Sequence, residues 1–284
     1  RTLAPLAQIA NLFGRANNAK TSYKRLASFM EETQEDDVSE KNKGAIRREK
    51  LGSIEFKDTT YRYPEADLDT LRSINLSVNE GEKVAILGRN GSGKSTLMKL
   101  ASGLFKASDG LVMYDGVDIK QLHTDDLSRS IGIVLQDVQL FSGSIRENIT
   151  MGRQDIDQGD LINAGKLSGL DDFVSKIPGG YDLQLSDGGK GLSGGQRQSI
   201  ALARAIVHKP THFILDEPTS AMDMNAENIF ISQMGSIMQD STMLIVTHRM
   251  PLLNLVDRII VMNEGQIVED GPKEEIINKL NQPR

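Results

Sequence analysis

Short apolar runs separated by polar turns make up most of the chain after residue 52. Ile54 to Lys57 and Ile74 to Val78 alternate apolar and polar residues, which predicts strands with one buried face. Val84 to Leu87 is apolar without alternation, as in a strand that is buried on both faces. Similar patterns predict strands at Leu111–Tyr114, Val117–Ile119, Ile131–Leu135, Phe213–Leu215, Thr242–Thr247, Arg258–Met262 and Gln266–Glu269, and helices at Thr96–Ser102, Asp160–Ser168, Asp171–Lys176, Ser193–His208 and Pro272–Leu280.

The alternation of strands and helices predicts an α/β core, which a helical segment interrupts. From about residue 141 to 195 the chain consists of short helical pieces, broken by Pro178-Gly179-Gly180. Apolar strand patterns resume after this segment. We therefore expect a helical subdomain inserted between two parts of one α/β core.

The first 35 residues follow a third pattern. Apolar residues from Leu3 to Met30 recur at helical spacing and predict one long helix. Two interpretations of this helix stay open: an amphipathic helix packed on the domain that follows, or the cytoplasmic end of a last transmembrane helix. Residues 36–52 are polar and charged and predict a linker, and residues 53–284 then form the main domain.

Composition narrows the possible functions. The chain has 284 residues, enough for one large or two small domains, and a formal net charge of −6. This acidic balance argues against a broad nucleic-acid-binding surface, which needs clustered Lys and Arg. The sequence has no cysteine for disulfides or thiolate metal sites, and no run of about 18 apolar residues that could span a membrane. The chain begins with Arg1 rather than Met, so we expect a piece of a longer protein.

Residues 88–95, Gly-Arg-Asn-Gly-Ser-Gly-Lys-Ser, match the phosphate-loop pattern G-x-x-x-x-G-K-S in full. They stand between a predicted buried strand and a predicted helix, which is the context that such a loop requires. Lys94 can neutralise the β- and γ-phosphates of a nucleotide and the Ser95 hydroxyl can bind Mg²⁺. The alternative is an ordinary glycine-rich turn. We predict nucleotide contacts from Gly88, Asn90, Gly91, Ser92, Gly93, Lys94, Ser95 and Thr96, with Lys94 also acting in catalysis.

Two carboxylates follow the apolar strand Phe213–Leu215. Asp216 can hold Mg²⁺ directly or through water, and Glu217 can polarise an attacking water as general base. The alternative is a solvated acidic turn before Pro218. Because a phosphate loop is present in the same chain, we favour the catalytic interpretation.

A second short motif, Leu192-Ser193-Gly194-Gly195-Gln196, follows the phosphate loop in the chain. Ser193 and Gln196 also fit an S-x-x-Q capping box, so an ordinary helix start is the alternative. In this order the two motifs resemble the nucleotide-binding domain of ABC transporters, with Leu192 to Gln196 as its signature motif. The resemblance covers roughly Ile54 to Leu280. It implies Mg²⁺-dependent ATP hydrolysis by an α/β P-loop NTPase core of the ABC ATPase type, with an inserted helical subdomain and an N-terminal antiparallel β part.

The resemblance also implies roles for residues whose pattern alone indicates little. Gln136 would sense Mg²⁺, His248 would contact the γ-phosphate, and Tyr63 would stack on adenine. Each has an ordinary alternative, since a lone Gln, His or strand Tyr is common in proteins. Two chains would pack head to tail, so that Ser193, Gly194, Gly195 and Gln196 of one close over ATP held by the other, with Asp223 in the interface loop. His123, His208 and His212 receive no role.

Residues 1–30 resemble the corresponding stretch of bacterial type I secretion exporters, and residues 140–149 do so more loosely. This implies an ATPase at the cytoplasmic face of the bacterial inner membrane that powers export of a protein substrate. Its partners would be a second copy of itself and the transmembrane domain of the same exporter, with a periplasmic adaptor and an outer-membrane channel beyond, and no nucleic acid. The alternative is a soluble ABC-type ATPase of DNA repair or translation, not fused to a membrane domain. That alternative predicts tandem cassettes, a coiled-coil insertion, zinc cysteines or a basic face, and the sequence has none of them.

Overall fold

The computed structural model describes residues 3–32, 42 and 44–281. The chain divides into two compact units, Arg1–Ala45 and Ile46–Arg284, which we describe separately. The first unit contains the helix α1 (Leu3–Glu32), at the place where the sequence predicts a helix. Among the described residues, no helix combines the length and the apolar character that crossing a membrane requires. The two interpretations of α1 and the predicted boundaries at residues 35 and 52 stay predictions.

A six-stranded sheet forms the centre of the second unit. Its strand order is β12-β11-β3-β10-β9-β6, and all neighbours are parallel except β12, which runs antiparallel along the edge. The sheet is built from β3 (Lys83–Gly88), β6 (Ile131–Val134), β9 (His212–Asp216), β10 (Thr242–Val246), β11 (Arg258–Asn263) and β12 (Gln266–Pro272). Because the strands are parallel, the loops that follow them all lie at the carboxyl ends of the strands. Open α/β sheets bind ligands at these ends.

Two hydrophobic cores lie on opposite faces of this sheet. Along β10, Met243 and Ile245 belong to one core, and Leu244 and Val246 to the other. This division explains why the parallel strands lack polar alternation, because each face of the pleat meets an apolar layer. The first core includes helices α5 (Ile145–Thr150), α6 (Gln158–Leu167), α8 (Gly194–Ile206) and α9 (Met224–Ile237), and α10 (Lys273–Asn281) adds Ile276.

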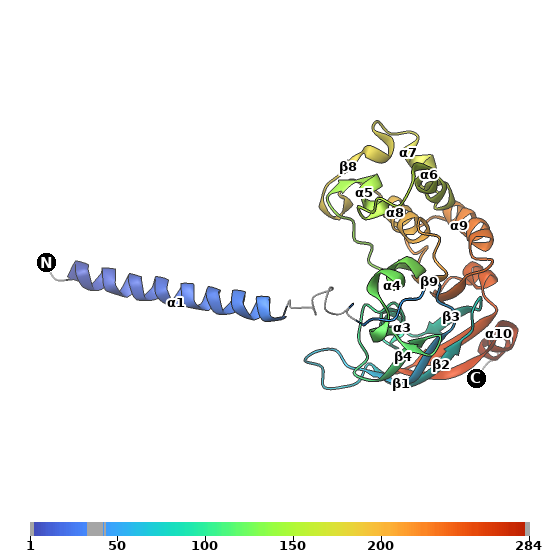
Figure 1. Cartoon of the computed structure of the whole chain (residues 1–284), viewed down its shortest axis with the longest axis horizontal. Coiled ribbons are helices and arrows are strands. Elements are labelled where there is room, and N and C mark those ends of the chain that lie inside the picture. Colours follow the sequence, from blue (N-terminus) through green and yellow to red (C-terminus); the bar gives the residue numbers. More distant parts are fainter. Residues whose placement is uncertain (1–2, 33–41, 43, 282–284) are drawn as a thin grey trace. The chain divides into compact units, whose positions relative to one another are not determined.

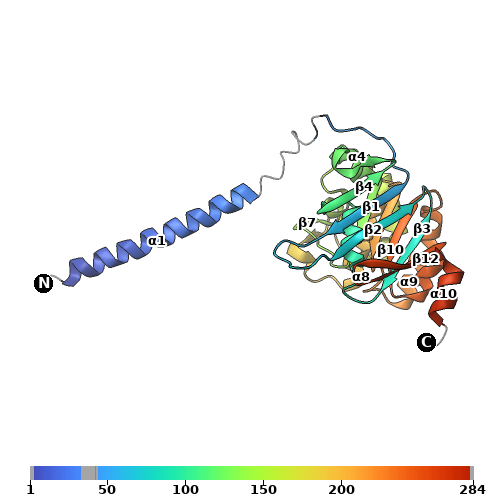
Figure 2. The ribbon, with the colours of Figure 1, turned by 90° about the horizontal axis from the view of Figure 1, so that it is seen from below.

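The second core lies between the central sheet and an antiparallel sheet of order β2-β1-β4-β5. Figure 2 shows β4, β1 and β2 side by side. Helix α3 (Lys94–Ala101) contributes Leu97, Met98 and Leu100 to this core and contacts β3, β9 and β10. The antiparallel strands are β1 (Ile54–Tyr61), β2 (Leu71–Val78), β4 (Asp109–Tyr114) and β5 (Val117–Asp118). The predicted N-terminal antiparallel part is therefore present.

A group of short helices forms one end of the second unit, with β1, β2 and β4 toward the other end (Figure 1). This end contains α5, α6 and the start of α8, together with α7 (Asp171–Val174), the 3₁₀ turns Gly180–Asp182 and Asp187–Gly189, and the small ladder of β7 (Gly143–Ser144) and β8 (Gln184–Leu185). It occupies the chain between β6 and β9. The predicted helical insertion into an α/β core is confirmed.

Several elements differ from the prediction. Helices α4 (Thr124–Ser130), α5 and α9 were not expected, because α4 and α5 are short and α9 places Ile229, Phe230 and Ile231 in one unbroken apolar run. Strand β5 ends at Asp118, and Ile119 opens a 3₁₀ turn (Ile119–Gln121). Pro272 pairs with Arg258 as the last residue of β12, so the final helix opens one residue later than predicted.

The remaining 3₁₀ element is η4 (Met250–Leu255), which follows the loop after β10 and has a proline at its start. It packs against α9, and its Leu252 and Leu253 join the first core. The loop between Val246 and Met250 is thereby fixed at both ends, which places His248 and Arg249 beside the carboxyl ends of the strands.

Candidate active site

A hollow of about 640 Å³ lies at the carboxyl ends of β3, β9 and β10. It collects residues that are far apart in the sequence, since the loops after these three strands meet at one sheet edge. Its lining includes eleven predicted site residues: Tyr63, Asn90, Gly91, Gly93, Lys94, Ser95, Thr96, Gln136, Asp216, Glu217 and His248. Gly88 and Ser92 belong to the same phosphate loop but do not line the hollow.

The side chain of Lys94 is held across the phosphate loop. Its Nζ donates to the backbone oxygens of Gly88 at 2.8 Å and Arg89 at 3.0 Å. Burial lowers the pKa of Lys94, and the charges of Asp216 and Glu217 act in the opposite direction. The ammonium group is thus bound to carbonyl groups at the rim of the hollow, from which it can reach a phosphate.

The backbone of the loop curves in a way that only small residues permit. Gly93, directly before α3, has φ 97°, and a Cβ there would lie 2.6 Å from Leu71 Cδ2. Gly91 has φ 81°, and a Cβ there would meet nothing within 4 Å. The Ser92 hydroxyl is buried and has no hydrogen-bond partner in the described part of the chain. One side of the loop is therefore tightly packed and the other open toward the hollow, as an anion-binding nest requires.

Asp216 fits the role of a cation ligand. It is 2% exposed, and its Oδ1 has no hydrogen-bond partner among the described residues. Burial raises its pKa, while a hydrogen bond to Ser95 and the charge of Lys94 oppose this shift. An acceptor oxygen buried beside a serine hydroxyl suits Mg²⁺, which prefers oxygen ligands. Ser95, Asp216 and Gln136 line the hollow together. The described residues contain no group of three or more His, Cys, Asp or Glu side chains that could hold a metal ion.

Glu217 has a strained backbone at the end of β9. Its φ is 51°, a left-handed value that residues with a Cβ rarely adopt. Its N–H donates to the Val246 oxygen at 2.9 Å, and its carboxylate Oε1 lies 3.6 Å from Nε2 of His248. Burial raises the pKa of Glu217, and the charge of His248 opposes this effect. Two predicted catalytic residues thus lie next to each other in the lining of the hollow.

Tyr63 belongs to an aromatic group at the outer rim. Its ring meets Tyr61 edge to face at a centroid distance of 5.1 Å and Phe105 at 5.7 Å. Its hydroxyl lies 3.1 Å from the Thr96 hydroxyl. Tyr63 is about one-third exposed, so part of its surface can meet a ligand. Tyr63 lies two residues after the end of β1 at Tyr61, so the alternative of an ordinary strand aromatic is wrong for Tyr63, and its stacking role stays a prediction.

The signature residues lie at the start of α8 and line a different hollow. Ser193 accepts from the Gln196 N–H at 3.2 Å, and its own N–H donates to Gln196 Oε1 at 2.8 Å. The capping box that the alternative interpretation predicts is therefore present. The same residues also line a hollow, so the capping box does not exclude a binding role for this helix N-terminus. Ser193, Gly194, Gly195, Gln196 and Asp223 line a hollow of about 320 Å³ that shares no lining residue with the phosphate-loop hollow. Within one chain, the two motifs therefore do not form one pocket.

Sequence reasoning missed Thr70, Val246 and Arg249, which also line the phosphate-loop hollow, as does Ser220 of the predicted interface loop. Arg249 is paired with the buried Glu227 at 3.1 Å and donates to the Ser220 oxygen at 3.3 Å. Glu227 also accepts from the Thr219 hydroxyl at 2.7 Å. The signal for this network was weak, because Glu227 lies on α9, a helix that the sequence pattern did not predict.

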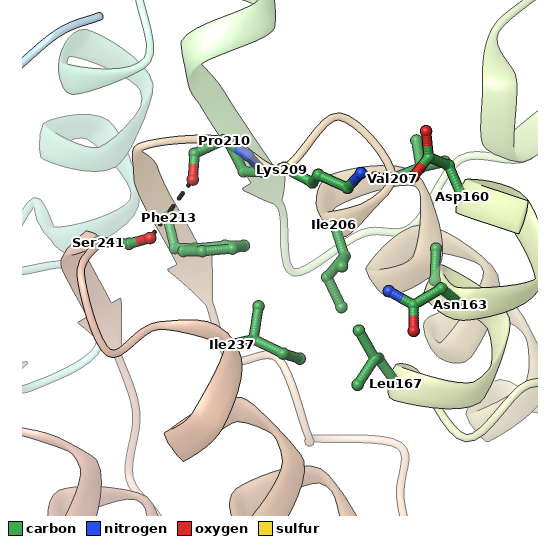
Figure 3. A pocket seen from close by; sticks show the side chains of 11 residues that line it. Asp160, Asn163, Leu167, Ile206, Val207, Lys209, Pro210, Phe213, Ile237 and Ser241 are labelled. Atoms are coloured by element: carbon green, nitrogen blue, oxygen red, sulfur yellow. Dashed lines mark hydrogen bonds and ion pairs between the residues drawn. The ribbon is translucent and has the colours of Figure 1, made fainter. Parts of the chain in front are cut away.

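A further hollow of about 420 Å³ lies at the amino end of β9 (Figure 3). Its floor is apolar and includes Phe213, Ile206 and Ile237, and on its rim Lys209 is paired with Asp160 at 2.6 Å. It lies at the opposite end of β9 from Asp216, and no glycine-rich loop lines it. It therefore has no part in the candidate active site.

A family model described as ABC transporter matches residues 71–220, a range that includes the phosphate loop, the signature residues and the two carboxylates at the end of β9. A solved structure of a bacterial Atm1-family ABC exporter with ATP bound is similar to this chain, with a TM-score of 0.75 and 31% sequence identity. The match covers 81% of this chain and 40% of that one.

Three curated proteins are similar along nearly the whole chain. The leukotoxin export ATP-binding protein LtxB of Aggregatibacter actinomycetemcomitans is 38% identical over 97% of this chain. The cyclolysin secretion/processing ATP-binding protein CyaB of Bordetella pertussis is 37% identical over 96% of this chain. The leukotoxin translocation ATP-binding protein LktB of Mannheimia glucosida is 38% identical over 99% of this chain. The chain spans 38%, 38% and 39% of their respective lengths.

Proposed function

Because the chain belongs to the ABC transporter family, whose fold and ATPase activity it shares, we propose that it is the ATP-hydrolysing domain of an exporter that secretes a protein. The observation that carries the proposal is the meeting of Lys94, Asp216 and Glu217 in one hollow at the sheet edge. These residues supply a cation for phosphate, an oxygen ligand for Mg²⁺ and a base for water, the three groups that phosphoryl transfer to water needs.

Each predicted residue has a definite part in this proposal. The backbone N–H groups of residues 90–95 bind the α- and β-phosphates, and Lys94 neutralises the β- and γ-phosphates. Ser95, Gln136 and Asp216 would hold Mg²⁺, and the bound ion would supply positive charge beside the phosphates. Glu217 accepts a proton from the attacking water, and His248 donates a hydrogen bond toward the γ-phosphate. Tyr63 stacks on adenine.

The signature end of α8 completes the site of a second copy. Its hollow is separate from the phosphate-loop hollow, and its helix N-terminus with Gly194 and Gly195 suits an anion that approaches closely. Two chains packed head to tail bring this end onto ATP bound by the partner. Asp223, which caps α9 and lines the same hollow, belongs to that interface.

The similar proteins support an exporter rather than a soluble ATPase of DNA repair or translation. LtxB, CyaB and LktB are named for export, secretion and translocation of toxins, and they match this chain from α1 to α10. We propose that α1 continues the last transmembrane helix of the same exporter, at the cytoplasmic face of a bacterial inner membrane. A periplasmic adaptor and an outer-membrane channel complete the path of a protein substrate.

The direct test is ATP binding and hydrolysis by the purified chain with and without Mg²⁺. We expect slow, Mg²⁺-dependent hydrolysis, and we expect Lys94→Ala to lose most of its affinity for ATP, because the phosphate charge loses its cation. Lys106→Ala, which removes a lysine outside the hollow, serves as the control and retains affinity. Unchanged ATP binding by Lys94→Ala contradicts the assignment of the phosphate loop.

A further inference from the structure

Gln198 is a buried polar residue on α8 that the mechanism above does not use. It is 3% exposed. Its side-chain Nε2 donates to the backbone oxygen of Glu217 at 3.0 Å, and its Oε1 accepts from the backbone N–H of Ala221 at 3.1 Å. Burying an amide is costly unless both ends are paired, and here both ends are paired to the loop that follows β9. One side chain therefore joins the signature helix to two points of that loop.

The carbonyl group that Gln198 holds belongs to a strained residue. Glu217 keeps its left-handed φ of 51° while its N–H is bound to Val246 and its oxygen accepts from Ser220 at 3.1 Å. Gln198 is a second donor to that oxygen. Because the positions of the two adjoining peptide groups set the direction of the Cα–Cβ bond, these hydrogen bonds fix the direction in which the Glu217 side chain leaves the backbone.

Ala221, the other partner of Gln198, packs against the glycine end of the same helix. A Cβ at Gly194 would lie 3.0 Å from the Ala221 Cβ, and a Cβ at Gly195 would lie 3.5 Å from the Ala221 oxygen. The start of α8 and the loop at Ala221 are thus in direct contact. A displacement of the helix start moves Ala221, and through Gln198 it also reaches Glu217.

We propose that Gln198 is a positioning residue for hydrolysis, coupling the start of α8 to the orientation of the Glu217 carboxylate. This inference rests on the proposed function, in which the start of α8 serves ATP in the partner copy and Glu217 serves ATP in its own. Gln198 then connects the two nucleotide sites of the dimer through the interior of each chain.

Two substitutions separate the two hydrogen bonds. Gln198→Met removes both at nearly constant side-chain length, whereas Gln198→Glu, when ionised, retains the acceptor for Ala221 and loses the donor to Glu217. Gln184→Met is the matched control, because the Gln184 amide also donates to a backbone oxygen, that of Asp182 at 3.4 Å, but does so on the exposed surface.

We expect both Gln198 variants to lower kcat for ATP hydrolysis about ten-fold with little change in KM, since the loss of one of two donors holds the Glu217 peptide group less firmly and misdirects the base without touching ATP. Gln184→Met retains the wild-type kcat. In a Glu217→Gln background, Gln198→Met lowers the residual rate less than about two-fold, because the group through which it acts is already missing.

Three results would overturn the inference. They are an unchanged kcat of Gln198→Met, a wild-type kcat of Gln198→Glu above the pH at which its carboxyl group ionises, which would leave only the Ala221 bond important, and a ten-fold loss that persists in the Glu217→Gln background, which would indicate general damage. The unchanged chain is assayed alongside. If the unchanged chain does not hydrolyse ATP, the proposed function and this inference are both refuted. If the unchanged chain hydrolyses ATP and one of the three results is obtained, only the role of Gln198 is refuted.

Discussion

At the scale of single residues, the candidate site is marked by groups that cost stability. Asp216 Oδ1 and Ser92 Oγ are buried with no hydrogen-bond partner among the described residues, and Glu217 holds a left-handed φ. Buried polar atoms without a partner are uncommon in proteins, and strained backbone positions are frequent at active sites. These features are independent of the sequence motifs, and they lie on the same residues.

Glu217→Gln should retain ATP binding and lose roughly 10²- to 10⁴-fold in hydrolysis, the usual contribution of a positioned base. The variant should also accumulate an ATP-bound dimer, because hydrolysis no longer opens it. Turnover assays and light scattering with and without ATP measure the two effects. Normal hydrolysis by this variant would remove Glu217 from the role of base.

His212, which received no functional role, is a structural titrating group. Its Nε2 lies 2.6 Å from the Gly52 oxygen and its Nδ1 lies 2.9 Å from the Thr211 hydroxyl. Burial lowers the pKa of His212, so the folded chain keeps it neutral at a pH where the unfolded chain already binds a proton. Stability rises with pH wherever the unfolded state binds more protons.

We therefore expect the free energy of unfolding to fall as the pH drops below about 6.5, the ordinary pKa of histidine. His212→Gln should show a shallower fall, because it removes the group whose pKa differs between the two states. Urea denaturation at a series of pH values provides the slopes. Equal slopes for the two proteins would show that His212 does not contribute.

At the scale of elements, the helical subdomain depends on a close contact between α6 and a 3₁₀ turn. Gly165 on α6 faces the Tyr181 hydroxyl, and a Cβ at this glycine would overlap it. That hydroxyl donates to Asp171 Oδ1 at 3.2 Å, and burial raises the pKa of Tyr181 to about 12. The sequence pattern predicts α6 but not this contact, since nothing local indicates which residue will face a glycine.

Gly165→Ala should destabilise the chain by about 1–3 kcal/mol, because the added methyl group forces Tyr181 to move. Gly235→Ala in α9 is the control, since its Cβ would meet only Leu255, at 4.0 Å. There the better helix propensity of alanine should stabilise the chain by up to about 1 kcal/mol. Chemical denaturation compares the two variants, and equal stability of both would contradict the packing argument.

At the scale of the whole molecule, the separation of the two hollows raises the question of where one complete site forms. We propose a site shared between chains, and mixing two defective proteins tests it. One protein carries Lys94→Ala and the other Ser193→Arg, both in a Glu217→Gln background so that bound ATP persists. Each homodimer has two defective sites whether the halves meet within or between chains.

The mixed dimer differs between the two arrangements. If the site is shared, one site combines the intact Lys94 of one protein with the intact Ser193 of the other, and ATP should drive association of the mixture above that of either parent. If each chain completes its own site, mixing should add nothing. Crosslinking under the same conditions shows that mixed dimers form. A mixture that never exceeds its parents would then refute the shared site.

The sequence by itself determined the α/β core, the phosphate loop and the carboxylates after Phe213–Leu215. Their signals are local: a strand buried on both faces is a continuous apolar run, and a phosphate nest needs glycines and a lysine at fixed spacing. The insertion was visible for the same reason, because its short helical pieces differ from the strands on both sides.

Only the tertiary structure decided which side chains meet across these elements. The Arg249–Glu227 pair and the Gln198 amide join residues on different elements, and no periodicity of one element records its partner in another. Tertiary structure also set the ends of β5 and β12, because a strand ends where its hydrogen-bond ladder with the neighbouring strand ends, whatever the local propensity. Burial is decided in the same way, because desolvation depends on everything that surrounds a group. Asp216 Oδ1 is buried with no hydrogen-bond partner in the described part of the chain, and buried His212 is bound to the Gly52 oxygen.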